Sequence, residues 1–150
     1  EKAPEQGWKI FILGSAPGVA DTAAENIRNA YPGIQIVGTQ HGYFKPEEEP
    51  GIVEAIKTAA PDVLFVALGA PKQEMWISRY KETLQVPAML GIGGSMDVLS
   101  GNVKRAPEIW QKMNLEWLYR LLSQPSRWRR MLNLPKFAVA VLKQKMLRRK

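Results

Sequence analysis

Four short apolar segments, each of which runs into a glycine, are the feature that most constrains the fold of this 150-residue chain. The segments are residues 9–13, 34–38, 63–69 and 87–94. Stretches with the apolar spacing of a helix lie between them, at residues 19–31, 51–59 and 72–84. Continuously apolar strands that alternate with helices through short connections are typical of a parallel sheet covered by helices. The sequence therefore predicts an α/β fold, with a Rossmann-like parallel sheet and flanking helices.

A glycine turn is predicted at the end of every strand, at Gly14, Gly38, Gly69 and the pair Gly93-Gly94. Ligands of open parallel sheets bind beyond the carboxyl ends of the strands, where such turns lie. Gly14, Ser15 and Gly69 are therefore candidate substrate-binding residues. The run from Gly14 to Gly18 either holds a phosphate with backbone N–H groups or is a plain structural turn, and the sequence leaves both interpretations open.

The same turns argue against a dinucleotide-dependent oxidoreductase. The dinucleotide fingerprint needs a middle glycine in the first turn, and Ala16 stands there with Pro17 after it. The second predicted strand ends in Gly38-Thr39, without the acidic residue that binds the ribose of NAD. Hydride transfer is disfavoured.

Polar and aromatic side chains follow the predicted strands. Tyr43 beside Gly42 offers a ring that could stack on a flat base, or that simply packs in the fold. Gln73 begins a predicted helix and can donate and accept hydrogen bonds to a base or a sugar, unless it lies on a solvated first turn. Asp97 follows a glycine-rich turn, where its carboxylate either binds a ribose diol or caps a helix. No Asp-x-Asp pair is present, which disfavours a carboxylate-held Mg²⁺ on a diphosphate.

Charge divides the chain into two parts. Residues 1–100 contain 8 Lys/Arg and 12 Asp/Glu, whereas residues 101–150 contain 13 Lys/Arg and 2 Asp/Glu. The sequence predicts an α/β core over residues 1–103 and a basic helical appendage over residues 104–150, with one amphipathic helix at 107–122. Such a basic segment indicates a polyanionic partner, either nucleic acid, phosphates or an anionic membrane.

Composition excludes several classes of protein. The chain has no Cys and one His, which rules out a disulfide scaffold, a thiolate metal site and a multi-histidine metal site. Its longest apolar run near the C-terminus has six residues, far fewer than the roughly 20 that span a bilayer. The first residues are polar and lack an initiator Met, so we expect an internal start rather than a signal peptide.

Four ordered motifs resemble one family over essentially the whole chain. They read GTQHGYF, GAPKQEMWI, GIGGSMDVLSGNVKRAP and EWLYRLLSQPSRWRR. Together they are similar to the WecG/TagA/CpsF glycosyltransferases, and most of all to the TagA type. The resemblance implies an inverting, metal-independent transfer of N-acetylmannosamine from UDP-N-acetylmannosamine to undecaprenyl-diphosphate-linked GlcNAc, in teichoic acid synthesis. It places the protein as a peripheral protein on the cytoplasmic face of the bacterial membrane.

The resemblance also implies roles for individual residues. Tyr43, Gln73 and Asp97 match the nucleotide-sugar pocket, and Arg120, Arg127 and Arg130 match arginines of a membrane-contacting appendage that stabilise the diphosphate. The family's proposed general base, an Asp in an N-terminal part, has no counterpart in this sequence. We therefore expect this chain to lack the base, to need no cofactor, and to expose apolar surface that favours a homo-oligomer. The alternatives are a non-catalytic nucleotide-sugar-binding fragment and a basic nucleic-acid-binding α/β domain.

Overall fold

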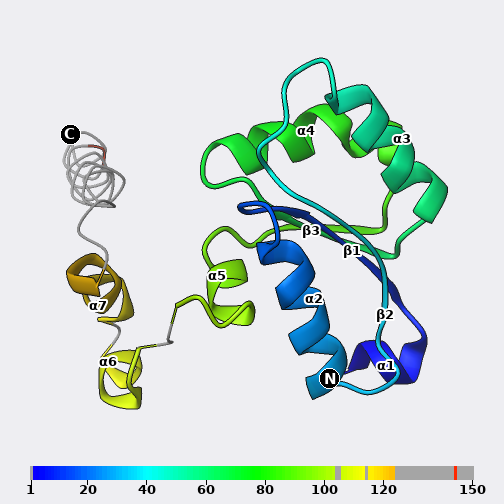
Figure 1. The fold of residues 1–150 in the computed structure, drawn as a ribbon. Helices are drawn as coiled ribbons and strands as arrows, with labels where there is room; N and C mark the ends of the chain where they lie inside the picture. The colour runs from blue at the N-terminus through cyan, green and yellow to red at the C-terminus, as the bar shows by residue number, and fades with distance from the viewer. Residues whose placement is uncertain (1, 104–105, 114, 124–143, 145–150) are drawn as a thin grey trace. The chain divides into compact units, whose positions relative to one another are not determined.

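A computed structural model describes residues 2–103, 106–113, 115–123 and 144 (Figure 1). The chain divides into two compact units, residues 1–104 and residues 105–150.

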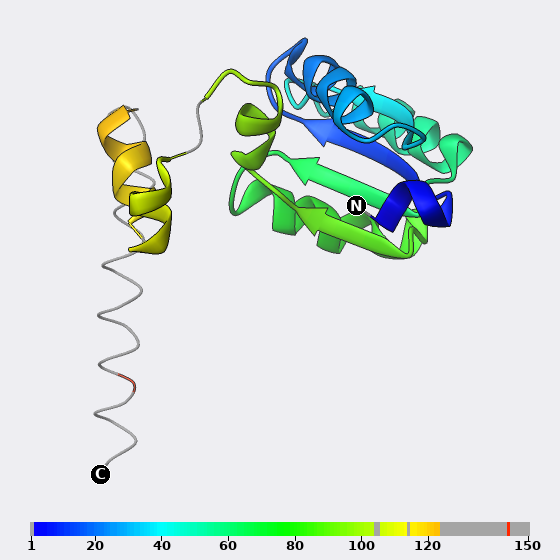
Figure 2. The same ribbon diagram turned by 90° about the horizontal axis from the view of Figure 1, so that it is seen from below.

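A four-stranded, all-parallel sheet forms the centre of the first unit. Its strands are β1 (Lys9–Gly14), β2 (Gln35–Gln40), β3 (Val63–Ala67) and β4 (Ala88–Gly91). They lie in the order β2-β1-β3-β4, and Figure 2 shows their arrows running in one direction. This arrangement confirms the predicted α/β fold with a Rossmann-like parallel sheet.

Helices cover both faces of the sheet. The helices of this unit are α1 (Lys2–Gln6), α2 (Val19–Ala30), α3 (Glu49–Ala59), α4 (Lys72–Leu84) and α5 (Ser95–Leu99). Figure 1 shows α3 and α4 on one side of the sheet, with α2 and α5 on the other. The connections between strands and helices are short, as the alternating pattern requires.

Residues Ile10–Leu13 of the central strand β1 are all apolar because both faces of the sheet are covered there. Ile10 and Ile12 lie in the core cluster under α2, while Phe11 and Leu13 lie in the cluster under α3 and α4. Successive side chains of a strand point to opposite faces, so a strand covered on both faces must be apolar at every position. Ile12 and Leu13 are completely buried.

One half of one sheet face is less covered than the rest. Phe65 of β3 packs only partly buried against the cluster under α2, and Leu90, its register partner on β4, is 48% exposed. Figure 2 shows most of β3 and β4 with no described helix in front of them, apart from α1 at the N-terminal end of β3.

The second predicted strand differs from the observed one at Gly38, which does not end the strand. β2 continues to Gln40, and Gly38 lies inside it, opposite Phe11, at a register shift that leaves Val37 as an extra residue. A Cβ atom on Gly38 would lie 2.8 Å from Cδ2 of Phe11. The glycine is thus explained by the close packing of an aromatic ring, which a single sequence does not reveal.

The third and fourth predicted strands, at residues 63–69 and 87–94, extend too far. β3 stops at Ala67 and β4 stops at Gly91, because the chain turns at Gly69 (φ 79°) and Gly93 (φ 45°). The prediction also missed α1 and α5, which have five residues each and are too short to show a helical period.

In the second unit, two helices replace the single predicted helix at residues 107–122. They are α6 (Glu108–Lys112) and α7 (Glu116–Ser123). The rings of Trp110 and Tyr119 lie 5.8 Å apart, centroid to centroid. On one straight helix, residues nine apart point about 180° away from each other, so this ring contact requires the break. Within the described residues, no helix is long and apolar enough to cross a membrane.

Candidate functional site

Backbone contacts join three loops where β1, β2 and β3 end. We call Gly14, Ser15, Gly42, Ala67 and Leu68 the three-loop junction. Gly14 has φ 130°, and a Cβ atom there would lie 2.5 Å from the carbonyl oxygen of Ala67. The same carbonyl accepts a hydrogen bond of 2.9 Å from the N–H of Ser15. Only glycine fits at position 14, because any side chain there would collide with the backbone of Ala67.

The loop after β2 completes the junction. The N–H of Gly42 donates a 2.8 Å hydrogen bond to the carbonyl of Ser15. A Cβ atom on Gly42 would lie 2.8 Å from Leu68 Cδ2 and 3.1 Å from Gly14 Cα. Both backbone polar groups of Ser15 are therefore used between loops, and Ser15 itself has φ 61°, which is rare outside glycine. The structure favours the structural interpretation of the backbone at Gly14 and Ser15.

Two aromatic residues, Tyr43 and Phe44, follow the tightly packed Gly42 and lie in different surroundings. Tyr43 is 75% exposed, whereas Phe44 packs against the core cluster under α3 and α4. The Nζ atom of Lys72, at the start of α4, lies 5.2 Å from the centroid of the Phe44 ring. At this distance a cation and an aromatic face attract each other. Tyr43 thus presents its ring to the exterior beside a partly buried neighbour that packs against the core.

Gln73 lies in the first turn of α4, beyond the end of β3. It is one of two buried polar side chains among the described residues, the other being Ser100. Its N–H donates to the carbonyl of Gly69 at 3.0 Å, and its side chain bonds Glu74 and Gly93. The alternative interpretation of Gln73, as a residue of a solvated first turn, is wrong, since burial and three hydrogen bonds hold it in the fold.

Asp97 lies on α5, which follows the loop after β4. Its carbonyl accepts hydrogen bonds from the N–H of Val103 at 3.0 Å and from Ser100 Oγ at 3.1 Å. The preceding residue, Met96, is completely buried against α2 and β1. Asp97 does not precede the helix, so the interpretation of its side chain as an N-cap is wrong; the N-cap position is Gly94.

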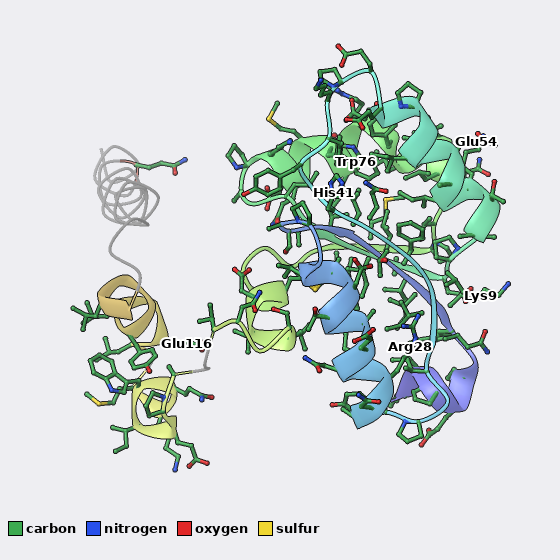
Figure 3. All side chains as sticks on the ribbon, viewed as in Figure 1. Lys9, Arg28, His41, Glu54, Trp76 and Glu116 are labelled. Atoms are coloured by element: carbon green, nitrogen blue, oxygen red, sulfur yellow. The ribbon has the colours of Figure 1, made fainter. Side chains whose placement is uncertain are left out.

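Two further features at this end of the sheet were not predicted. The hydroxyl of Thr39, in β2, donates a hydrogen bond to the carboxylate of Asp21, in the first turn of α2. The ring nitrogens His41 Nδ1 and Trp76 Nε1 are buried and have no hydrogen-bond partner among the described residues (Figure 3). Sequence patterns carry no signal for any of these, because each depends on contacts between distant segments.

The three arginines that were predicted to stabilise the diphosphate have no described side chains. Arg120 belongs to α7 of the second unit, and the structure describes only its backbone. Arg127 and Arg130 lie outside the described residues. Within the described residues, no group of three or more His, Asp or Glu side chains is placed to hold a metal ion.

An open groove of about 750 Å³ runs beside β2 and reaches Thr39 and Gln40 at the end of that strand. It is bounded by α3 and β2, and none of the predicted substrate-binding residues lines it. We assign the site to the loops at the strand ends instead, because the strand ends bring the polar side chains together.

The structure therefore brings most of the predicted binding residues to one edge of the sheet. Gly14 and Ser15 contact Ala67 at the end of β3, and Gly69 follows two residues later and accepts a hydrogen bond from Gln73. Tyr43 follows the junction, and Gln73 connects to the loop before α5. Sequence reasoning named Gly42 only as the neighbour of Tyr43, without its contact to Gly14, and it missed Gly91. Their motifs, GYF and GIGG, contain the signal, but a glycine in a loop does not show which atom approaches it.

Comparison with known proteins identifies the family. A family model described as the glycosyl transferase WecG/TagA/CpsF family matches residues 1–150. The chain is 44% identical over 143 residues to a protein of Bacillus spizizenii named N-acetylglucosaminyldiphosphoundecaprenol N-acetyl-beta-D-mannosaminyltransferase. The alignment covers 95% of this chain and 55% of the relative, so the chain spans about half the length of that protein. With a family model that matches its whole length and a relative that is 44% identical to it, the chain belongs to the WecG/TagA/CpsF family of glycosyl transferases.

Proposed function

We propose that this chain forms the donor-binding and diphosphate-binding part of an inverting glycosyltransferase. The reaction is transfer of N-acetylmannosamine from UDP-N-acetylmannosamine to undecaprenyl-diphosphate-linked GlcNAc, in teichoic acid synthesis. The observation that carries the proposal is the exposed ring of Tyr43 at the carboxyl edge of a parallel sheet, where ligands bind. The name of the Bacillus spizizenii relative supplies the sugar and the acceptor.

The proposed chemistry needs two things from the protein. The acceptor hydroxyl attacks the anomeric carbon of the donor, the bond from that carbon to the diphosphate oxygen breaks, and UDP leaves. Guanidinium groups form bidentate contacts with phosphate oxygens, so Arg120, Arg127 and Arg130 stabilise the charge on the leaving UDP without a metal. A general base takes the proton of the hydroxyl.

No residue of this chain is proposed as that base. The family resemblance assigns it to an Asp in a region with no counterpart here, and the relative is almost twice as long as the matched part. We therefore expect this chain to bind UDP without transferring the sugar.

Membrane association and self-association belong to the same proposal. The acceptor carries a lipid, and the basic residues 101–150 provide attraction for an anionic membrane surface, which in this proposal is the cytoplasmic face. Leu90, exposed on β4, supports a homo-oligomer, which sedimentation velocity tests.

Removal of the exposed ring tests the donor site. We expect Tyr43→Ala to weaken UDP binding about tenfold, because stacking of one base on an aromatic side chain contributes about 1–3 kcal/mol. Tyr31→Ala is the matched control, since Tyr31 is also exposed but follows α2 at the opposite end of the helix from the site. Isothermal titration of UDP into the three proteins measures the difference.

Two results would contradict the proposal. One is a folded wild-type chain that binds RNA in a salt-sensitive manner and does not bind UDP, as a nucleic-acid-binding domain would. The other is equal UDP affinity in Tyr43→Ala and wild type, which would remove Tyr43 from the site.

A further inference from the structure

The side chain of Gln73 connects two loops that are 20 residues apart in sequence. Its Oε1 atom accepts a 3.1 Å hydrogen bond from the N–H of Gly93, and its Nε2 atom donates a 2.8 Å hydrogen bond to Oε1 of Glu74. Only 6% of the residue is exposed. We call this arrangement of Gln73, Glu74 and Gly93 the Gln73 bridge.

Glycine at position 91 makes room for the bridge. A Cβ atom there would lie 2.7 Å from Nε2 of Gln73 and 3.1 Å from its Cδ. The amide therefore lies directly over the backbone of Gly91, at the end of β4. An alanine at this position would have to displace the amide from its two hydrogen bonds. Gln73 of the KQE motif thus contacts Gly91 and Gly93 of the GIGG motif.

The Gln73 bridge contacts the loop that leads into α5, the helix that carries Asp97. The N–H of Ile92 donates to the carbonyl of Val66 at 2.9 Å, which fixes the start of the loop to β3. Gly93, the next residue, has φ 45° and is held by Gln73. The carbonyl of Gly93 then accepts from the N–H of Met96, at 3.4 Å, in the first turn of α5. The first turn of α5 is therefore connected to the bridge through Gly93, while the burial of Met96 and a 3.0 Å hydrogen bond from Asn26 Nδ2 to the carbonyl of Leu99 hold the helix against α2.

We propose that Gln73 is a positioning residue, which holds the residue 92–94 loop and Asp97 in the geometry that binds the donor, and does not itself contact the donor. This role rests on the proposed function. The side chain is buried, and its carbonyl and amino groups are both engaged within the protein. Its contribution to donor binding therefore passes through the loop.

A double-mutant cycle tests the contact between Gln73 and Gly91. Loss of a buried hydrogen-bonded contact corresponds to about tenfold in affinity, so we expect Gln73→Ala and Gly91→Ala each to weaken UDP binding about tenfold. The double variant should also lose about tenfold rather than about a hundredfold, because the added methyl group enters the space that the amide has left. Independent, multiplying effects would overturn the proposal.

An exchange of the two polar side chains separates positioning from direct contact. Gln73→Glu alone keeps an acceptor for the N–H of Gly93 but places a second carboxylate against Glu74. The Gln73→Glu, Glu74→Gln double variant restores a donor and an acceptor with the direction of the bond reversed. If Gln73 is a positioning residue, the double variant recovers UDP affinity to within about threefold of wild type. Failure to recover affinity in a folded double variant would indicate direct contact with the donor and overturn the proposal.

Amide hydrogen exchange of Gly93 gives a measurement that does not require UDP. The N–H of Gly93 should be protected in wild type and in the Gln73→Glu, Glu74→Gln variant, and should exchange at least tenfold faster in Gln73→Ala. Unchanged exchange in Gln73→Ala would overturn the bridge even if UDP binds. Absence of UDP binding by the wild type, with normal protection of Gly93, would instead overturn the proposed function and the role of the bridge in it.

Discussion

Replacement of Gly14 by alanine is expected to destabilise the first unit by about 4 kcal/mol, because two costs combine. The added Cβ atom would lie 2.5 Å from the carbonyl oxygen of Ala67, which is backbone and cannot rotate away. The φ angle of 130° is also a conformation that residues with side chains rarely adopt. The free energy of unfolding, from urea denaturation followed by circular dichroism, measures the effect.

Gly18→Ala is the matched control for this prediction. Gly18 also has a positive φ, 80°, but no atom lies within 4 Å of a Cβ atom placed there. Its replacement should cost only the backbone strain, about 1 kcal/mol. Equal destabilisation by the two substitutions would show that the close approach to Ala67 contributes nothing, and the three-loop junction would lose its physical basis.

Removal of three neighbouring arginines is expected to weaken binding to anionic vesicles about a hundredfold. Each basic residue near an anionic surface contributes about 1 kcal/mol, so Arg127→Ala, Arg129→Ala and Arg130→Ala together remove about 3 kcal/mol. The prediction rests on the charge of this sequence segment, which lies outside the described residues. Co-sedimentation with vesicles that contain phosphatidylglycerol, at low and high salt, measures the partition.

A charge-matched variant of the first unit provides the comparison. Lys57, Arg79 and Lys81 are exposed cations on α3 and α4, and their replacement by alanine changes the net charge by the same amount. This variant should retain most of its vesicle binding. If both variants lose affinity equally, net charge alone drives binding and the basic segment has no special part in it.

The strand interiors and the layer arrangement could be predicted because both depend on local pattern. Ile10–Leu13 of β1 are all apolar because helices cover both faces of the sheet at this strand, and this requirement is visible in the sequence itself. The strand ends could not be predicted with the same accuracy. Gly38 lies inside β2 because the Phe11 ring needs its space, a contact between segments that are far apart in sequence.

The candidate site, too, could be predicted only in part. Gln73 was predicted from its position after a strand, and that position is confirmed. Its burial and its bond to Gly93 depend on the loop after β4, so no pattern around Gln73 itself indicates them. The break between α6 and α7 has a similar origin, because the contact of Trp110 with Tyr119 overrides a continuous helical period.

The three-loop junction has a consequence for how this site can change over evolutionary time. Its hydrogen bonds join N–H and carbonyl groups, and its tight contacts depend on missing side chains at Gly14 and Gly42. The side chains of Ser15 and Tyr43 take no part in those hydrogen bonds. Substitutions of the exposed Tyr43 therefore leave the loop framework intact, whereas Ser15, at φ 61°, accepts only residues that tolerate a left-handed backbone. The surface beside the junction can thus change at position 43 without rebuilding the fold that presents it.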